Sequence, residues 1–301
     1  MLEQTIIFGT ISGLIYALIA LGFSLIYGIS GMINLTHGAF FVVGAYIFSV
    51  LASFLLQYVS LDLYLVLALA IILSFAFTGI IGSFFYRLTF HQILGDEVGM
   101  LIASICGCLI FQQLIYIIMG NAPALGFNVP TIIRGVTSIG PTTVPTGQIL
   151  AAAISFLAFA ILSLILAKTK IGRAMKALSQ DLEAAMLMGV SIEKLYMLTT
   201  AVSAGFSSLG GILYTSTITN SVSTYMWLTS LAISFTVVLL GGLGSIKGTL
   251  LGGLIFGYAE QAVIATIPRA GVILQSFPFI VIILVLIIRP KGLFGKRIEM
   301  E

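Results

Sequence analysis

Few side chains in this sequence could transfer a proton or bind a cation, and most of those lie outside its long apolar stretches. Of ten acidic residues, only Glu260 falls well inside such a stretch. A buried acid can relay protons, and proton-driven carriers normally need such groups within the membrane. Because no second group for such a relay is evident, we expect the Glu260 carboxylate to accept a hydrogen bond from another helix rather than to couple transport to protons. Glu260 is also a candidate to line the translocation pathway.

The cysteine, histidine and glycine patterns indicate neither a catalytic site nor a metal site. Cys106 and Cys108 stand two residues apart in one apolar stretch, which places them on opposite sides of a helix. The two histidines, His37 and His91, belong to different segments. The phosphate-binding pattern Gly-x-x-x-x-Gly-Lys-Ser/Thr does not occur, so this chain should not hydrolyse ATP itself. We therefore expect no catalytic residue and no bound metal or cofactor.

A short polar block from Asn34 to Gly38 precedes an apolar stretch that carries no charge. Two interpretations of the block are open. Asn34, Thr36 and His37, with Gly38, could line a translocation pathway and offer hydrogen bonds to a zwitterion in transit. Alternatively, the same residues cap and pack the start of a helix, with Thr36 at the N-cap position.

The polar segment 168–194 is predicted to contain a short helix. Asp181 is a good N-cap, residues 182–188 are good helix formers, and Gly189 suits the left-handed position that ends a helix. Exposed apolar side chains on a short helix need a partner surface, either a membrane surface or, as we favour, another protein. The predicted apolar face consists of Leu182, Ala185, Met186 and Leu187.

The composition of the chain excludes a soluble protein. Hydrophobic residues make up 59% of its 301 residues, charged residues only 8%, and the mean hydropathy is +1.19, whereas soluble domains are about a quarter charged. Stretches of roughly 20 apolar residues can cross a bilayer. We predict an all-α integral membrane protein, a polytopic bundle of about nine (eight to ten) transmembrane helices near residues 5–27, 36–56, 63–86, 98–119, 148–167, 195–216, 226–245, 248–267 and 272–288. The spans at 36–56 and 248–267, rich in glycine and polar residues, could be broken or re-entrant.

The basic residues predict the orientation of the bundle. With nine spans, only Arg134 and Arg269 lie on one side, and the other eleven basic residues share the opposite side. Because loops rich in lysine and arginine stay in the cytoplasm, we expect a cytoplasmic C-terminus and an external N-terminus. The eleven are Arg87, Lys168, Lys170, Arg173, Lys176, Lys194, Lys247, Arg289, Lys291, Lys296 and Arg297.

Residues 1–301 are predicted to form a single transmembrane domain with one long external loop at 120–147. The loop holds four of the seven prolines, which exclude a continuous helix. Loops of this length are usually functional or disordered. This one could be a structured cap or a docking site for an external partner.

Several blocks of the sequence resemble one family of permeases. Glu183-Ala184-Ala185-Met186-Leu187-Met188-Gly189 is similar to the EAA loop of ATP-binding cassette (ABC) importer permeases. The blocks Asn34–Phe40, Gly44–Tyr46, Gly241–Ser245 and Arg289–Gly295 widen the resemblance to permeases of branched-chain amino acid ABC importers (LivH type), over essentially the whole chain. One departure is that residues 196–200 lack the Leu-Pro of the broader ABC pattern, which leaves the exact seating of the loop open.

The resemblance implies a half-transporter in a prokaryotic plasma or inner membrane. Such permeases pair with a second homologous permease, two cytoplasmic ATPase subunits that use the ATP, and an extracytoplasmic solute-binding protein. The loop at 181–189 would be the coupling helix that seats in the ATPase. The implied solutes are branched-chain or related small amino acids, and no nucleic acid is implied. The alternative is a stand-alone channel or facilitator for a small neutral solute such as urea or an amide, with segment 168–194 merely structural.

Overall fold

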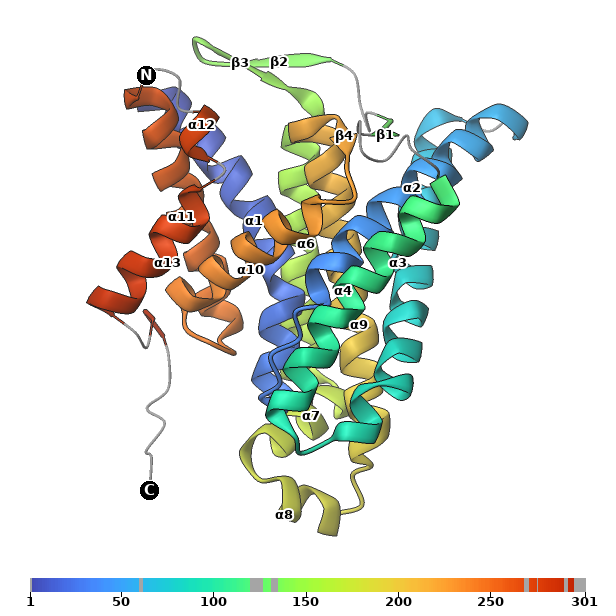
Figure 1. The fold of residues 1–301 in the computed structure, drawn as a ribbon. Coiled ribbons are helices and arrows are strands. Elements are labelled where there is room, and N and C mark those ends of the chain that lie inside the picture. Colours follow the sequence, from blue (N-terminus) through green and yellow to red (C-terminus); the bar gives the residue numbers. More distant parts are fainter. Residues whose placement is uncertain are drawn as a thin grey trace.

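The computed structural model describes residues 2–59, 62–119, 127–130, 135–267, 271–274, 276–289 and 292–294, which form a bundle of long helices (Figure 1). Within this described part, seven helices are long and apolar enough to cross a membrane. The expected polytopic helical membrane protein is therefore confirmed. The seven are α1 (Leu2–Ser30), α2 (His37–Tyr58), α3 (Leu63–Leu88), α4 (Glu97–Met119), α6 (Thr146–Lys168), α9 (Ile192–Tyr214) and α11 (Ile246–Thr266).

Two helices in the C-terminal part of the chain, α10 and α13, are shorter than the sequence predicts. Helix α10 (Met226–Gly241) ends where Gly242 adopts a φ of 101°, a conformation that breaks the helix. The expected continuous span at 272–288 is wrong, because α12 (Gly271–Leu274) and α13 (Phe277–Ile288) are separate helices. Pro278 sits in the first turn of α13, where its missing N–H is tolerated but a helix cannot continue through it.

The two spans that could have been broken or re-entrant are continuous helices. Helix α2 covers 22 residues and α11 covers 21 without interruption. Their glycines serve close packing instead of breaking the helix. A Cβ added at Gly44 of α2 would collide with the side chain and Cα of Ser208 in α9. Close backbone approach at small residues is how membrane helices associate without a hydrophobic driving force between them.

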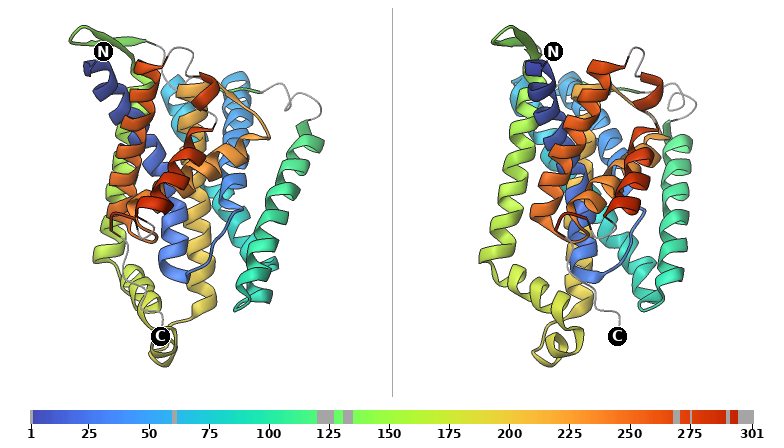
Figure 2. Two further views of the ribbon diagram at one scale, coloured as in Figure 1. Left: turned by 60° about the vertical axis from the view of Figure 1, so that its left-hand side comes forward. Right: turned by 90° about the vertical axis from the view of Figure 1, so that its left-hand side faces the viewer.

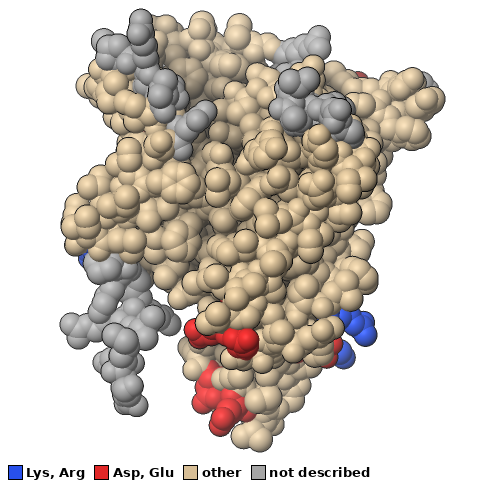
Figure 3. Space-filling model, in the orientation of Figure 1, with Lys and Arg blue, Asp and Glu red and all other residues tan. Residues whose placement is uncertain are grey.

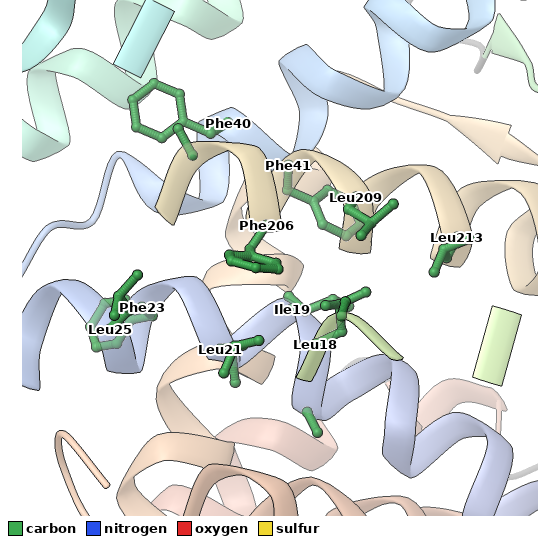
Figure 4. Close-up of a cluster of buried hydrophobic side chains, with 14 of the residues drawn as sticks. Leu18, Ile19, Leu21, Phe23, Leu25, Phe40, Phe41, Phe206, Leu209 and Leu213 are labelled. Carbon is green, nitrogen blue, oxygen red and sulfur yellow. The ribbon is translucent and has the colours of Figure 1, made fainter. Parts of the chain in front are cut away.

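Helix α1 occupies the middle of the bundle and contacts α11, α9, α10 and α6 (Figure 2). Its apolar side chains face those of α2 and α9 in the core (Figure 4). Ile19 of α1, for example, lies opposite Phe206 and Leu209 of α9. Helix α4 has few contacts with the bundle and stands at its side in Figure 2.

Two of the blocks behind the family resemblance meet at the end of α10. The N–H of Leu293 donates to the carbonyl of Leu240 at 3.0 Å, and the N–H of Phe294 donates to that of Gly241 at 3.1 Å. Gly292 reaches this position with a φ of 68°, close to the Leu239 carbonyl. The described part of the block, residues 292–294, therefore supplies hydrogen bonds to carbonyls that the end of a helix leaves free.

The end of the bundle at which α1 begins carries the described part of loop 120–147. Strands β2 (Val136–Ile139) and β3 (Thr142–Pro145) form an antiparallel hairpin, and β1 (Phe127–Asn128) pairs with β4 (Ser221–Val222). β4 follows the π-helical turn η2 (Thr215–Thr219) after α9. No continuous helix is present in the described residues of the loop, as its prolines predict. Residues 120–126 and 131–134 of the loop lie outside the described part.

Candidate functional site

The segment 168–194 forms two short helices at the end of the bundle opposite the start of α1 (Figure 1). The sequence predicts one, and the second, α7 (Lys170–Gln180), was missed. It begins at Thr169, whose side chain accepts a hydrogen bond from the N–H of Gly172 at 3.1 Å. The buried side chains of Met175 and Leu178, three residues apart, hold α7 against the bundle. That spacing is the signal that could have revealed it.

Helix α8 (Leu182–Leu187) has the expected caps at both ends. The Asp181 carboxylate accepts a hydrogen bond from the N–H of Ala184 at 2.9 Å. Gly189 adopts a φ of 81°, its N–H donates to the carbonyl of Met186, and the N–H of Val190 donates to that of Ala185. These two bonds make a Schellman motif, which satisfies the last carbonyls of the helix.

The apolar face of α8 is exposed, but one of its predicted members is not. Leu187 is 89% exposed and Met188 is 85% exposed, and Leu182 and Met186 are also exposed. Ala185 is buried, so the prediction that it belongs to the exposed face is wrong. Ser191 occupies the N-cap position of α9, but its side chain makes no capping bond there. A helix that presents leucine and methionine outward, away from its own bundle, is suited to bind another protein.

The polar block before α2 is buried in the described structure. The Asn34 side chain accepts a hydrogen bond from the N–H of Thr36 at 3.0 Å, which stabilises the turn into α2. Thr36 occupies the N-cap position but makes no side-chain cap, and its hydroxyl donates instead to the carbonyl of Ser104 in α4 at 2.9 Å. The expected capping role of the Thr36 side chain is therefore wrong. At Gly38, an added Cβ would collide with the Trp227 carbonyl, so this position must stay glycine.

His37 joins three helices. Its Nε2 lies 2.8 Å from the Ile19 carbonyl of α1, which requires the N–H on this nitrogen. Its Nδ1 lies 3.4 Å from the hydroxyl of Ser203 in α9, and that hydroxyl donates to the Gly22 carbonyl. Ser207 of α9 donates to the backbone carbonyl of His37 at 2.7 Å. These serines were not singled out in the sequence, where they stand four residues apart on one face of a helix.

We expect His37→Ala to destabilise the folded permease. The change leaves a buried void and removes the bond to Ile19, which together cost about 2–4 kcal/mol. A thermal unfolding measurement on the protein in detergent should show a clear drop in midpoint. His37→Gln, which keeps a donor, should lose less, and His91→Ala should lose little because His91 is exposed. If His37→Ala unfolds like wild type but transports poorly, a role in the pathway is favoured over packing.

Helix α4 is attached to the bundle through the same polar block. Cys108 donates to the carbonyl of Leu35 at 3.2 Å, and the Trp227 indole N–H of α10 donates to the Gln112 side chain. Cys108 is buried whereas Cys106 is exposed, as their spacing predicts. Together with the Thr36 bond, these contacts hold a helix that otherwise has few neighbours.

The hydrogen bond of Glu260 is separate from those of the Asn34–Gly38 block. Its carboxylate accepts a hydrogen bond from the hydroxyl of Tyr16, which joins α11 to α1. The Tyr16 ring also lies edge-on to Phe256, with centroids 5.3 Å apart. The expected interhelix bond is confirmed. The two candidate parts of the pathway therefore bond to different residues of α1. His37 bonds to the Ile19 carbonyl, and Glu260 bonds to the Tyr16 hydroxyl.

Comparison with known proteins assigns the chain to a family. Residues 5–286 match the family described as branched-chain amino acid transport system / permease component. The chain belongs to this family. Its members are transport permeases rather than enzymes. Within the described residues, no group of three or more His, Cys, Asp or Glu side chains could hold a metal ion.

Individual relatives in this permease family resemble the chain over nearly its whole length. The high-affinity branched-chain amino acid transport system permease protein LivH of Escherichia coli (strain K12) is 28% identical, over 96% of this chain and 94% of its own. BraD of Pseudomonas aeruginosa, a permease protein of the same kind of system, is 29% identical over 97% and 95%. A shorter part of the chain is similar to the ribose import permease protein RbsC of Haemophilus influenzae, at 37% identity over 35% of this chain and 34% of that protein.

Proposed function

We propose that this chain is the membrane-spanning permease subunit of an ABC importer for branched-chain or related small amino acids. It would pair with a second homologous permease, receive its solute from an extracytoplasmic binding protein, and be driven by two cytoplasmic ATPase subunits that use the ATP. The observation that carries the proposal is helix α8, capped at both ends and exposing Leu187 and Met188. The family membership and the near full-length relatives support the class of solute.

Helix α8 would act as the coupling helix. The coupling helix would comprise the residues from Asp181 to Met186 together with Gly189. Only a short turn through Val190 separates it from α9. Helix α9 contacts α1, α2 and α3, and it carries the serines that meet His37. A force applied to α8 by an ATPase would therefore reach the centre of the bundle through one continuous helix.

The orientation follows from the same assignment. If α8 faces the cytoplasm, the start of α1 and the β2–β3 hairpin face outward, where the hairpin would meet the binding protein (Figure 1). We retain nine crossings, with α10 and α13 as short crossings in addition to the seven long helices. The C-terminus is then cytoplasmic and the N-terminus external, which agrees with the distribution of lysine and arginine.

The buried positions at Asn34, Thr36, His37, Gly38 and Glu260 remain candidates for the pathway. In the described structure the side chains of Asn34, Thr36 and His37 are buried and out of reach of a solute. They would contact solute only when helices α1, α2 and α9 separate. Permeases fed by a binding protein need little affinity of their own, so a sharply defined pocket is not required.

Uptake into proteoliposomes tests the proposed function. The permease pair with its ATPases, ATP and loaded binding protein should accumulate labelled leucine against its gradient. Removing the ATPases or ATP should reduce uptake to the level of protein-free vesicles. A stand-alone facilitator for a neutral solute predicts the opposite, namely equilibration of urea or an amide by this chain without ATP. Family membership does not favour that alternative.

A further inference from the structure

A pocket of about 590 Å³ opens beside α8. Its walls come from the turn after α1, the start of α4 and the near ends of α8 and α9. Met32, Val98, Leu101, Leu182 and Tyr196 make most of this lining apolar, and Val98 is 68% exposed. The volume is enough for several side chains, and the rim at Leu182 is continuous with the exposed face of α8.

The rim of this pocket is acidic. Glu97 lines it and Asp96 precedes Glu97, while Asp181 and Glu183 flank Leu182 in the sequence. All four carboxylates are exposed. No lysine or arginine lines the pocket among the described residues. Figure 3 shows acidic side chains gathered at the lower end of this face, and basic ones at its lower right edge beside a further acidic one.

We propose that this pocket is a second contact for the ATPase subunit, which would insert an apolar side chain flanked by lysine or arginine. The inference rests on the proposed function, since it takes the ATPase as the partner of α8. Two observations select this occupant. The pocket adjoins α8 without a gap, and its acidic rim is complementary to a basic protein segment. An acidic rim is repelled by the anionic lipids of the cytoplasmic leaflet, which disfavours a lipid headgroup as the occupant.

The consequence is that docking on this face depends on salt. Opposite charges at the edge of an interface steer association and are screened beyond about 8 Å at physiological ionic strength. The apolar contacts of α8 are not screened in this way. The two parts of the surface should therefore respond differently to added salt.

A double substitution, Asp96→Asn with Glu97→Gln, tests the charge. Asparagine keeps the bond that Asp96 makes to the N–H of Gly99 at the start of α4, so the helix should be retained. Affinity for the purified ATPase pair, measured in nanodiscs, should fall about five- to twentyfold at 50 mM salt. At 500 mM salt the variant and wild type should converge. Glu3→Gln, a neutralised acid at the opposite end of the bundle, is the matched control and should bind like wild type.

Photo-crosslinking tests the location. A benzophenone amino acid at Val98 should crosslink to the ATPase in the assembled complex, and one at Val136 of the hairpin should not. Crosslinks from position 98 only to the second permease or to lipid would overturn the inference, as would wild-type affinity of the double variant at both salt concentrations. A variant with Leu187→Asp and Met188→Asp distinguishes a failure of the pocket inference from a failure of the proposed function. If that variant also binds the ATPase normally, the proposed function itself fails.

Discussion

Replacing Leu187 and Met188 by aspartate should abolish ATP-dependent uptake while leaving the bundle folded. Both side chains are almost fully exposed, so the folded permease loses no internal contact. Burying a leucine or methionine at an interface contributes about 1.5–3 kcal/mol each, and an aspartate would have to be desolvated in the same place. We therefore expect at least a hundredfold loss of affinity for the ATPase, measured by co-purification and by uptake into proteoliposomes.

Ala177→Asp is the matched control for this change. Ala177 is exposed on α7 in the same segment, so the variant adds a charge at the same end of the molecule without touching α8. It should assemble and transport nearly as wild type does. If the double aspartate variant still hydrolyses ATP in response to loaded binding protein, α8 is not the coupling helix.

Gly257→Leu should prevent the permease from folding. A Cβ at this position would lie 2.5 Å from the backbone nitrogen of Gly13 and 2.6 Å from the Gly9 carbonyl. Backbone atoms cannot move aside as a flexible side chain can, so α11 would have to separate from α1. Overpacking in a core typically costs about 1–3 kcal/mol, occasionally more. Because the contact is with backbone, we expect the destabilisation of this variant to lie at or above the upper end of that range. It should give little monodisperse protein in detergent.

The control for the glycine change lies on the other face of the same helix. Ala262 is exposed, so Ala262→Leu adds the same kind of side chain where nothing in the described chain opposes it. Its yield and thermal midpoint should stay close to those of wild type. Normal folding of Gly257→Leu would mean that α1 and α11 are not packed as closely as described.

The sequence predicted the features that depend on neighbouring residues. Long apolar stretches predicted the seven long helices, because a window of about 20 residues is enough to measure their hydropathy. Asp181 and Gly189 predicted both ends of α8, because each cap is formed within a few residues of chain. The same local reasoning was wrong where a side chain could bond to a distant residue instead of a neighbouring one. At Thr36, the hydroxyl bonds to the Ser104 carbonyl instead of capping α2.

Length was misjudged where a single residue decides it. Residues 272–288 are apolar enough to suggest one span, but the helix begins anew at Phe277 with Pro278 in its first turn. Similarly, Gly242 ends α10 earlier than hydropathy suggests. Hydropathy averages over a window, so it does not register the backbone conformation of one proline or glycine.

By itself, then, the amino-acid sequence determined that this is a helical membrane protein, where its long helices lie, and that a capped helix at 182–187 offers apolar side chains to a partner. Only the tertiary structure decided which positions meet. Tyr16 and Glu260 are 244 residues apart, and His37 and Ser203 are 166 apart. The pocket beside α8 is likewise assembled from three distant segments. Hydropathy and capping are properties of contiguous chain, whereas these contacts depend on which helices pack together, and no local pattern encodes that choice.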